Sequence, residues 1–339
     1  MSVYIRAYQA LLPDVFEQRV ISELKNIQGR FGKLSIPKNH KFYPEKSDSK
    51  IMRIDVIAAI IAIQTLLEQV GLDNNSLEKV GLFVANGAFL EEENRNIKRV
   101  MKTFEKIKTM EDDVEKLKYA FRSVPPLTAL ETLTNSAMSF IAKYAGTKGN
   151  NATYGNTSYS AYAALVDAIH DVHSGTTHAL VGGANGSGVF SALAHINFYD
   201  SCTNWTESEN SAFVLLQNNK TNAVAEIVKY QINASVPSLF GINKKRNWAS
   251  FFNGQTPEYL IYSGGFTPEE FDANRQEVLQ ISNHVFSWND THGNLGASSL
   301  IASIIKGVDR IRKGKHSVVD IVDRDPYGRE TYLQITNIK

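Results

Sequence analysis

Ser158 stands at the start of a predicted helix, where a serine can cap the helix or act as a nucleophile. From Asn151 the chain reads NATYGNTSYSAYAALVDAIHDVH, in which a short strand-like run, 152–156, leads directly into apolar residues at helical spacing. Serine is a favoured helix N-cap, so capping is the simpler interpretation. As a nucleophile, its hydroxyl needs a neighbouring general base, because a helix dipole alone does not ionise a serine near neutral pH.

Candidate bases come from the loop THGNLGASS, residues 291–299, and from His284. His292 and Asn294 flank Gly293 in this loop, and an asparagine can donate a hydrogen bond but cannot act as a base. The single cysteine, Cys202, excludes an internal disulfide and a thiolate metal cluster, and we interpret it as an inert thiol. The glycines at 183–188 follow GxxGxG and not the dinucleotide-binding GxGxxG, so the sequence predicts neither a metal nor a cofactor.

Charge and hydropathy exclude several classes of partner. The 339 residues carry 36 Lys+Arg and 35 Asp+Glu, so no global field favours nucleic acid or anionic lipid. The most hydrophobic run, Val56–Ile63, is too short to span a bilayer. The N-terminus lacks the features of an export signal, which predicts a cytoplasmic protein. A basic cluster, Lys244-Lys245-Arg246, is a candidate contact for an acidic protein surface.

Strand-like and helix-like segments alternate, which predicts an α/β architecture. A polar, turn-rich stretch near Tyr199–Asn210 predicts a division into residues 1–205 and 206–339. The expected strands are 80–85, 152–156, 178–183, 213–217, 225–234, 259–262, 318–322 and 331–335. The expected helices are 54–70, 91–109, 114–121, 130–145, 159–174, 268–280 and 297–312.

The segment from Gly149 to Asn185 resembles, without gaps, the nucleophile region of the β-ketoacyl synthases of the thiolase superfamily. In that family a cysteine occupies the turn where Ser158 stands. Further segments are similar in the family's order along the chain: 54–84, 126–146 with Asn135 at an asparagine position, SENSAFVLLQ at 208–217, and 291–299. The resemblance implies a thiolase-like, five-layered αβαβα fold made of two related halves.

The same resemblance implies an altered active site. Ser263, in SGGFTP at 263–268, replaces the family's first histidine, and Gly293 replaces the second, with His292 one position early and Asn294 one position late. The family's glycine-rich gate becomes Pro326-Tyr327-Gly328-Arg329. Condensation needs a thiolate and two histidines that converge, and losing one member of such a set removes most of the rate. No residue is therefore assigned as catalytic, and independent enzyme activity is left open.

A catalytically silent member of this family implies a chain-length factor. Such a subunit pairs with an active ketosynthase as a heterodimer, meets an acyl carrier protein, and shapes the acyl cavity in bacterial polyketide, aryl-polyene or fatty-acid-type biosynthesis. Two alternatives stay open. The first is a serine-dependent acyltransferase or ketosynthase variant in which Ser158 is acylated, with His292 or His284 as base. The second is a stand-alone acyl-binding homodimer.

Overall fold

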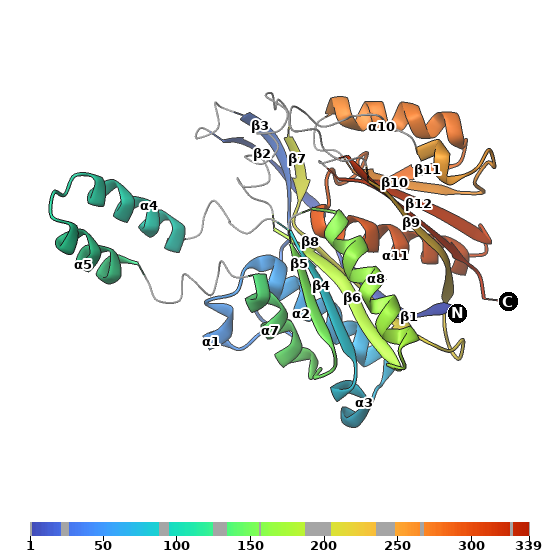
Figure 1. Ribbon diagram of the computed structural model, residues 1–339, viewed down its shortest axis with the longest axis horizontal. Helices are drawn as coiled ribbons and strands as arrows, with labels where there is room; N and C mark the ends of the chain where they lie inside the picture. The colour runs from blue at the N-terminus through green and yellow to red at the C-terminus, as the bar shows by residue number, and fades with distance from the viewer. Residues whose placement is uncertain are drawn as a thin grey trace.

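A computed structural model describes residues 2–21, 27–87, 95–124, 134–155, 157–186, 205–234, 248–264, 268–325 and 328–338. Ten of the described strands form one sheet, in the order β11-β10-β12-β13-β9-β1-β8-β6-β4-β5 (Figure 1). Their bounds are β1 Val3–Leu11, β4 Gly81–Asn86, β5 Asn151–Gly155, β6 His178–Asn185, β8 Asn210–Gln217, β9 Ala225–Ala234, β10 Leu260–Gly264, β11 Val285–Ser287, β12 Val318–Arg324 and β13 Arg329–Thr336. A smaller sheet joins β2 Val15–Ile21, β3 Ile27–Lys33 and β7 Trp205–Ser208.

The large sheet contains the same five-strand arrangement twice. In each set of five, counted along the chain, the spatial order is third, second, fourth, fifth, first: β5-β4-β6-β8-β1 and β11-β10-β12-β13-β9. In both sets the second strand pairs in parallel with the third and fourth, and the fifth is antiparallel to its neighbours. This repetition is the internal duplication that the two-halves expectation requires.

Helices cover the two sets in layers. The described helices are α1 Lys46–Ser49, α2 Ile54–Val70, α3 Asn74–Glu78, α4 Arg95–Lys108, α5 Asp113–Ser123, α7 Thr134–Ala145, α8 Tyr159–His173, α10 Pro268–Ile281 and α11 Ser299–Arg312, with 3-10 turns η2 Trp248–Phe251 and η3 Gly296–Ser298. α2 and α7 pack on one face of the first set, and α8 and α11 lie between the two sets. α10 and η2 cover the outer face of the second set. The result is a five-layered αβαβα structure, as expected.

Apolar spacing explains why α2 occupies its layer. Ile60, Ile63 and Leu66 are buried against the sheet, and further apolar side chains are buried around most of the helix. Its first turn holds a buried ion pair between Arg53 and Asp55, with 2.7 Å between Nη2 and Oδ2. Gly71 ends the helix in the left-handed conformation, with φ +67°. The helix predicted at 54–70 is confirmed.

The sequence predicts no strand before residue 80, and the structure has β1, β2 and β3 there. β1 pairs with β8 and β9, and β3 pairs with β7, all of which lie far along the chain, whereas β2 pairs with its neighbour β3. By pairing, β8 belongs to the first set, so the change between sets falls at residues 218–224. The division into residues 1–205 and 206–339 stays a prediction from composition.

Candidate active site

Asp323 is the centre of a buried polar cluster between the two sets of strands. Its carboxylate Oδ2 accepts hydrogen bonds from Ser263 Oγ and Ser299 Oγ, each at 2.5 Å. Ser263 is the penultimate residue of β10 and is paired with Asp323 across the parallel β10–β12 ladder, and Ser299 is the first residue of α11. Three elements distant in sequence thus place their polar side chains at the carboxyl end of neighbouring parallel strands.

Ser158 approaches the same carboxylate from the start of α8. The residue is 5% exposed, and its Oγ makes no hydrogen bond of ordinary geometry. Its hydroxyl nevertheless lies close enough to Asp323 to help lower the pKa of that carboxyl. Ser158 occupies the N-cap position with φ −57° and ψ −28°, but its side chain caps no backbone amide. The position expected for a helix start is confirmed, and the capping role expected for the hydroxyl is wrong.

Burial dominates the electrostatics of this cluster. It raises the pKa of Asp323 above its usual range, although the hydroxyls of Ser158, Ser263 and Ser299 oppose the shift. The nearby carboxylate of Asp325 raises the pKa further. Within the described residues, no histidine donates to or accepts from any of these four side chains. The cluster therefore offers one carboxylate and three hydroxyls as its chemistry.

Arg329 fixes the turn that carries Ser158. Its Nε donates to Asp325 Oδ2 at 2.6 Å, and its Nη2 donates to Thr157 Oγ1 at 3.1 Å. Its guanidinium lies 4.1 Å from the ring centroid of Tyr159. The side chain thereby holds the residues on both sides of Ser158. Pro326 and Tyr327, in the segment that the resemblance aligns with the glycine-rich gate, lie outside the described residues.

The loop expected to carry the second histidine is tied to the small sheet. Asn294 N donates to Thr206 O, and Ser208 N donates to Asn294 O, both at 3.1 Å. Gly293 has φ +71°, and a Cβ there would lie 2.2 Å from Thr206 Cγ2. A histidine at this position would therefore be both strained and obstructed. Asn294 Nδ2 is buried without a hydrogen-bond partner among the described residues, which leaves it available as a donor.

Neither candidate histidine base reaches the serine cluster through a hydrogen bond in the described structure. The ring of His292 packs edge-on against Phe16 and Trp288, with centroid distances of 5.8 and 5.3 Å, and its Nδ1 lies 2.8 Å from Thr291 Oγ1. Burial lowers the pKa of His292, so its neutral form is favoured. His284 is exposed and immediately precedes β11, whereas Ser263 lies near the opposite end of the adjacent parallel strand. The role of either histidine as a base for Ser158 stays a prediction.

Other sequence candidates divide between exposed and undescribed positions. Asn135 is exposed on α7, and Cys202 and the cluster Lys244-Lys245-Arg246 lie outside the described residues. Within the described part of the chain, no group of three or more His, Cys, Asp or Glu side chains is placed to hold a metal ion. Among the helices of that part, none combines the length and the apolar character that a bilayer crossing demands.

Sequence reasoning missed the residues that organise the site. Asp323, Ser299 and Arg329 received no role, because VVDIVDR reads as a buried strand and serine at a helix start reads as a cap. The available signal was the carboxylates themselves: Asp320 and Asp323 interrupt an otherwise apolar buried run. A carboxylate in such a run requires hydrogen-bond donors nearby.

Solved ketosynthases have the same architecture. A β-ketoacyl synthase from Burkholderia phymatum superposes with a TM-score of 0.71 over all of both chains, at 11% identity. A type II polyketide ketosynthase, solved with its acyl carrier protein and a bound hexaketide, gives 0.69 over 99% of both chains at 14% identity. The module 6 ketosynthase of the Bacillus subtilis bacillaene synthase gives 0.67 over the whole of this chain and 71% of its own, at 12% identity.

The chain has the ketosynthase fold. No protein-family model and no curated protein sequence matches it. The likeness is therefore one of backbone architecture, and it agrees with the five-layered, two-halves expectation. Within that fold, the serine–aspartate cluster stands where the resemblance expects the nucleophile and the first histidine.

Proposed function

We propose that the protein is a non-condensing, chain-length-factor-like subunit that pairs with an active ketosynthase in polyketide, polyene or fatty-acid-type biosynthesis. The observation that carries the proposal is the Ser158–Ser263–Ser299–Asp323 cluster. Condensation requires a thiolate and donors for a developing enolate. The cluster holds no thiol, the hydroxyls of Ser263 and Ser299 donate to Asp323, and the negative charge of that carboxylate disfavours an enolate beside it. What the chain contributes is then surface and cavity shape.

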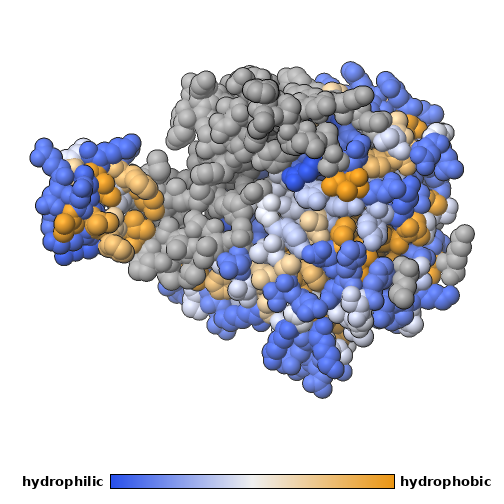
Figure 2. Space-filling model, viewed as in Figure 1, coloured by the Kyte–Doolittle hydropathy of each residue, from blue (hydrophilic) through white to orange (hydrophobic). Residues whose placement is uncertain are grey.

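Two surface features support a protein partner on the β5 side of the molecule. β5 is an edge strand in the described sheet, paired only with β4, and unpaired strand edges are ready templates for another strand. The α4–α5 hairpin projects from the body on that side (Figure 1). Figure 2 shows orange, apolar atoms on the surface of this arm. The exposed apolar side chains of the two helices include Phe104, Leu117 and Phe121, at 58, 61 and 83% exposure.

A second proposed partner is an acyl carrier protein. The type II ketosynthase was solved with an acyl carrier protein, and we extend that partner to the heterodimer that contains this chain. The chain would then contact the carrier protein as part of the pair, without accepting the acyl group itself.

Co-expression with the ketosynthase of the same pathway tests the pairing. We expect a stable one-to-one complex, carbon dioxide release and primer extension only when the ketosynthase is present, and acyl labelling confined to its cysteine. Decarboxylation of malonyl thioester and primer extension by the isolated chain would contradict the proposal. The double variant Leu117→Ser/Phe121→Ser, on the exposed face of α5, should weaken the complex, and Lys118→Ser on the same helix is the matched control.

One observation favours a second function. Ser158 Oγ is buried, has no ordinary hydrogen bond, and lies near a carboxylate whose pKa is raised, as an esterified serine would require. Intact-mass analysis after incubation with acyl carrier protein thioesters separates the two functions. An acyl adduct on the wild-type chain that disappears in Ser158→Ala would establish the acyltransferase, and an unmodified mass would exclude it.

A further inference from the structure

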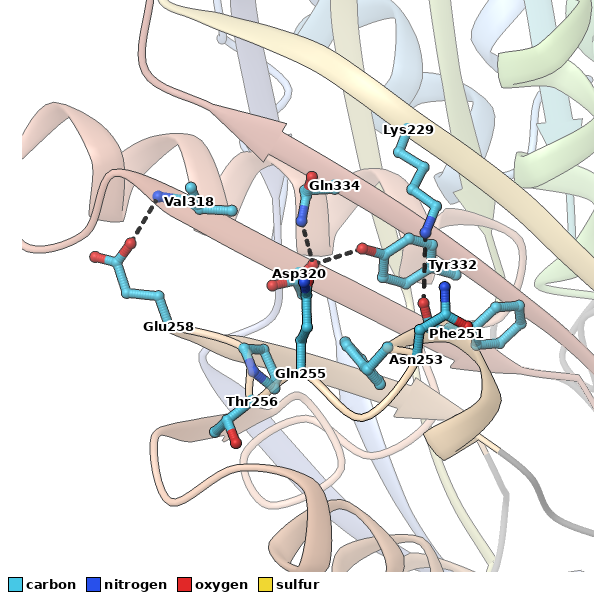
Figure 3. A pocket seen from close by; sticks show the side chains of 12 residues that line it. Lys229, Phe251, Asn253, Gln255, Thr256, Glu258, Val318, Asp320, Tyr332 and Gln334 are labelled. Carbon is cyan, nitrogen blue, oxygen red and sulfur yellow. Dashed lines mark hydrogen bonds between the residues drawn. The ribbon is translucent and has the colours of Figure 1, made fainter.

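A cleft of about 370 Å³ opens on the outer face of the second set of strands, away from the serine cluster. Alternate residues of β9, β12 and β13 form its floor, among them Lys229, Asp320 and Tyr332 (Figure 3). The segment 251–258 forms its wall. The ring of Phe251 stacks on Tyr332 with a centroid distance of 5.3 Å, so one side of the cleft is aromatic.

Asp320 is a buried carboxylate with one oxygen in use. Tyr332 Oη and Gln334 Nε2 both donate to its Oδ1, at 2.7 and 2.9 Å. Its Oδ2 accepts no hydrogen bond from any residue that the structure describes. Asp320 is only 3% exposed and lines the cleft. Its Oδ2 is therefore a fixed hydrogen-bond acceptor for which the described residues supply no donor.

The charges around Asp320 favour a cationic ligand. Two carboxylates, Asp320 and Glu258, line the cleft together with one ammonium, that of Lys229. The ammonium donates no hydrogen bond to Asp320, although its charge opposes the rise that burial causes in the pKa of that carboxyl: its Nζ donates to Phe251 O at 3.4 Å and lies 4.9 Å from the Tyr332 ring centroid. Among the described residues, no set of ligands sufficient for a metal ion is present. An organic cation therefore fits better than an inorganic one.

We propose that this cleft binds a small organic cation, a primary ammonium or guanidinium compound, whose N–H groups donate to Asp320 Oδ2. Its hydrocarbon part lies against Phe251, Phe252 and Tyr332, where the aromatic faces also attract positive charge. Glu258, at the opposite side of Asp320 from Lys229 in Figure 3, adds negative charge to the cleft, while its oxygens accept hydrogen bonds from Ser317 and Val318. The site is independent of the partner proposed above.

Titration calorimetry on the full chain with four ligands of one carbon skeleton tests the site. The ligands are n-butylammonium, n-butylguanidinium, 1-butanol and butyrate. We expect the two cations to bind with dissociation constants of about 1 mM, the range open to so small a ligand, and the alcohol and the anion not to bind. Equal binding of butanol would reduce the site to an apolar crevice, and binding of butyrate would reverse its charge preference. Either result, or no binding of the cations, overturns the proposal.

Three variants locate the contact. Asp320→Asn keeps the shape and should weaken cation binding at least about tenfold, the loss expected for a charge-assisted hydrogen bond. Lys229→Met removes a positive charge that repels the cationic ligand, so it should tighten cation binding. Glu258→Gln removes the other carboxylate of the cleft and is the fallback variant if Asp320→Asn does not fold. Because the Glu258 side chain is more exposed, this variant should weaken cation binding only about twofold. Unchanged affinity in the folded carboxylate variants, or loss of binding in Lys229→Met, would overturn the proposal.

Discussion

The starts of α8 and α11 occupy equivalent places in the two halves, since each helix connects the third and fourth strands of its set. Each helix has a serine at its start, and the hydroxyls of Ser158 and Ser299 both approach Asp323. In the second half the hydroxyls are in use: Ser298 Oγ donates to Asn210 and Ser299 Oγ to Asp323. In the first half Ser158 Oγ has no ordinary partner.

The difference separates structural from available polar groups. In the second half, the hydrogen bonds of Ser298 to Asn210 and of Ser299 to Asp323 connect the start of α11 to both sets of strands. In the first half, the conformation of the turn depends on Arg329, which leaves Ser158 uncommitted.

Removing Asp323 should have the largest effect on this comparison. Asp323→Ala leaves the hydroxyls of Ser263 and Ser299 without their acceptor and opens a cavity, so we expect a loss of about 2–4 kcal/mol in the free energy of unfolding. Urea denaturation monitored by circular dichroism measures it. Asp272→Ala, at an exposed position on α10, is the control and should change stability by less than about 0.5 kcal/mol. Equal effects of the two variants would remove Asp323 from the centre of the cluster.

A side chain at Gly293 should have the next largest effect. Gly293→Ala combines a left-handed backbone with a Cβ 2.2 Å from Thr206 Cγ2, and we expect a loss of about 2–3 kcal/mol. Gly314→Ala isolates the backbone contribution, because Gly314 has φ +63° with no atom within 4 Å of its added Cβ, and it should lose about 1 kcal/mol. Thermal melts of both variants measure the difference. A tolerant Gly293 would mean that the loop can accept the histidine it lacks.

The two helix-start serines should differ when each is truncated. Ser299→Ala removes a buried hydrogen bond to a carboxylate and should lose about 1–2 kcal/mol. Ser158→Ala removes no ordinary hydrogen bond and should stay within about 0.5 kcal/mol of the wild type. Parallel denaturation curves give both numbers. A reversed order would show that Ser158, and not Ser299, is the structural member of the pair.

The smallest effect should appear in the pH dependence of stability. Burial raises the pKa of Asp323 in the folded state, so the folded chain holds this proton to a higher pH than the unfolded chain does. The contribution of Asp323 to stability should therefore grow as pH falls from neutral through the raised pKa, and decline as pH rises. The difference between wild type and Asp323→Asn isolates this group from the other carboxylates. A difference that does not vary with pH would contradict the shift.

Local pattern predicted more of the fold than of the site. The strand at 225–234 and the helix at 54–70 follow from runs of apolar residues, and both were predicted to the residue. Ser158 and Ser263 were singled out by resemblance, and the structure brings them to one carboxylate. The identity of that carboxylate depends on the β10–β12 register, and the orientation of His292 depends on packing against Phe16 of the small sheet. Neither long-range pairing nor ring packing leaves a local trace in the sequence.

The first strand has a consequence for how the molecule unfolds. β1 pairs with β8 over Tyr4–Leu11 and with β9 over Val3–Ile5, and the apolar cluster beneath it contains residues of both halves. Loss of β1 would leave both β8 in the first set and β9 in the second without a neighbouring strand. The two halves should therefore unfold together and not one after the other. Scanning calorimetry should show one endotherm for the body of the protein, with the calorimetric enthalpy matching the van't Hoff value.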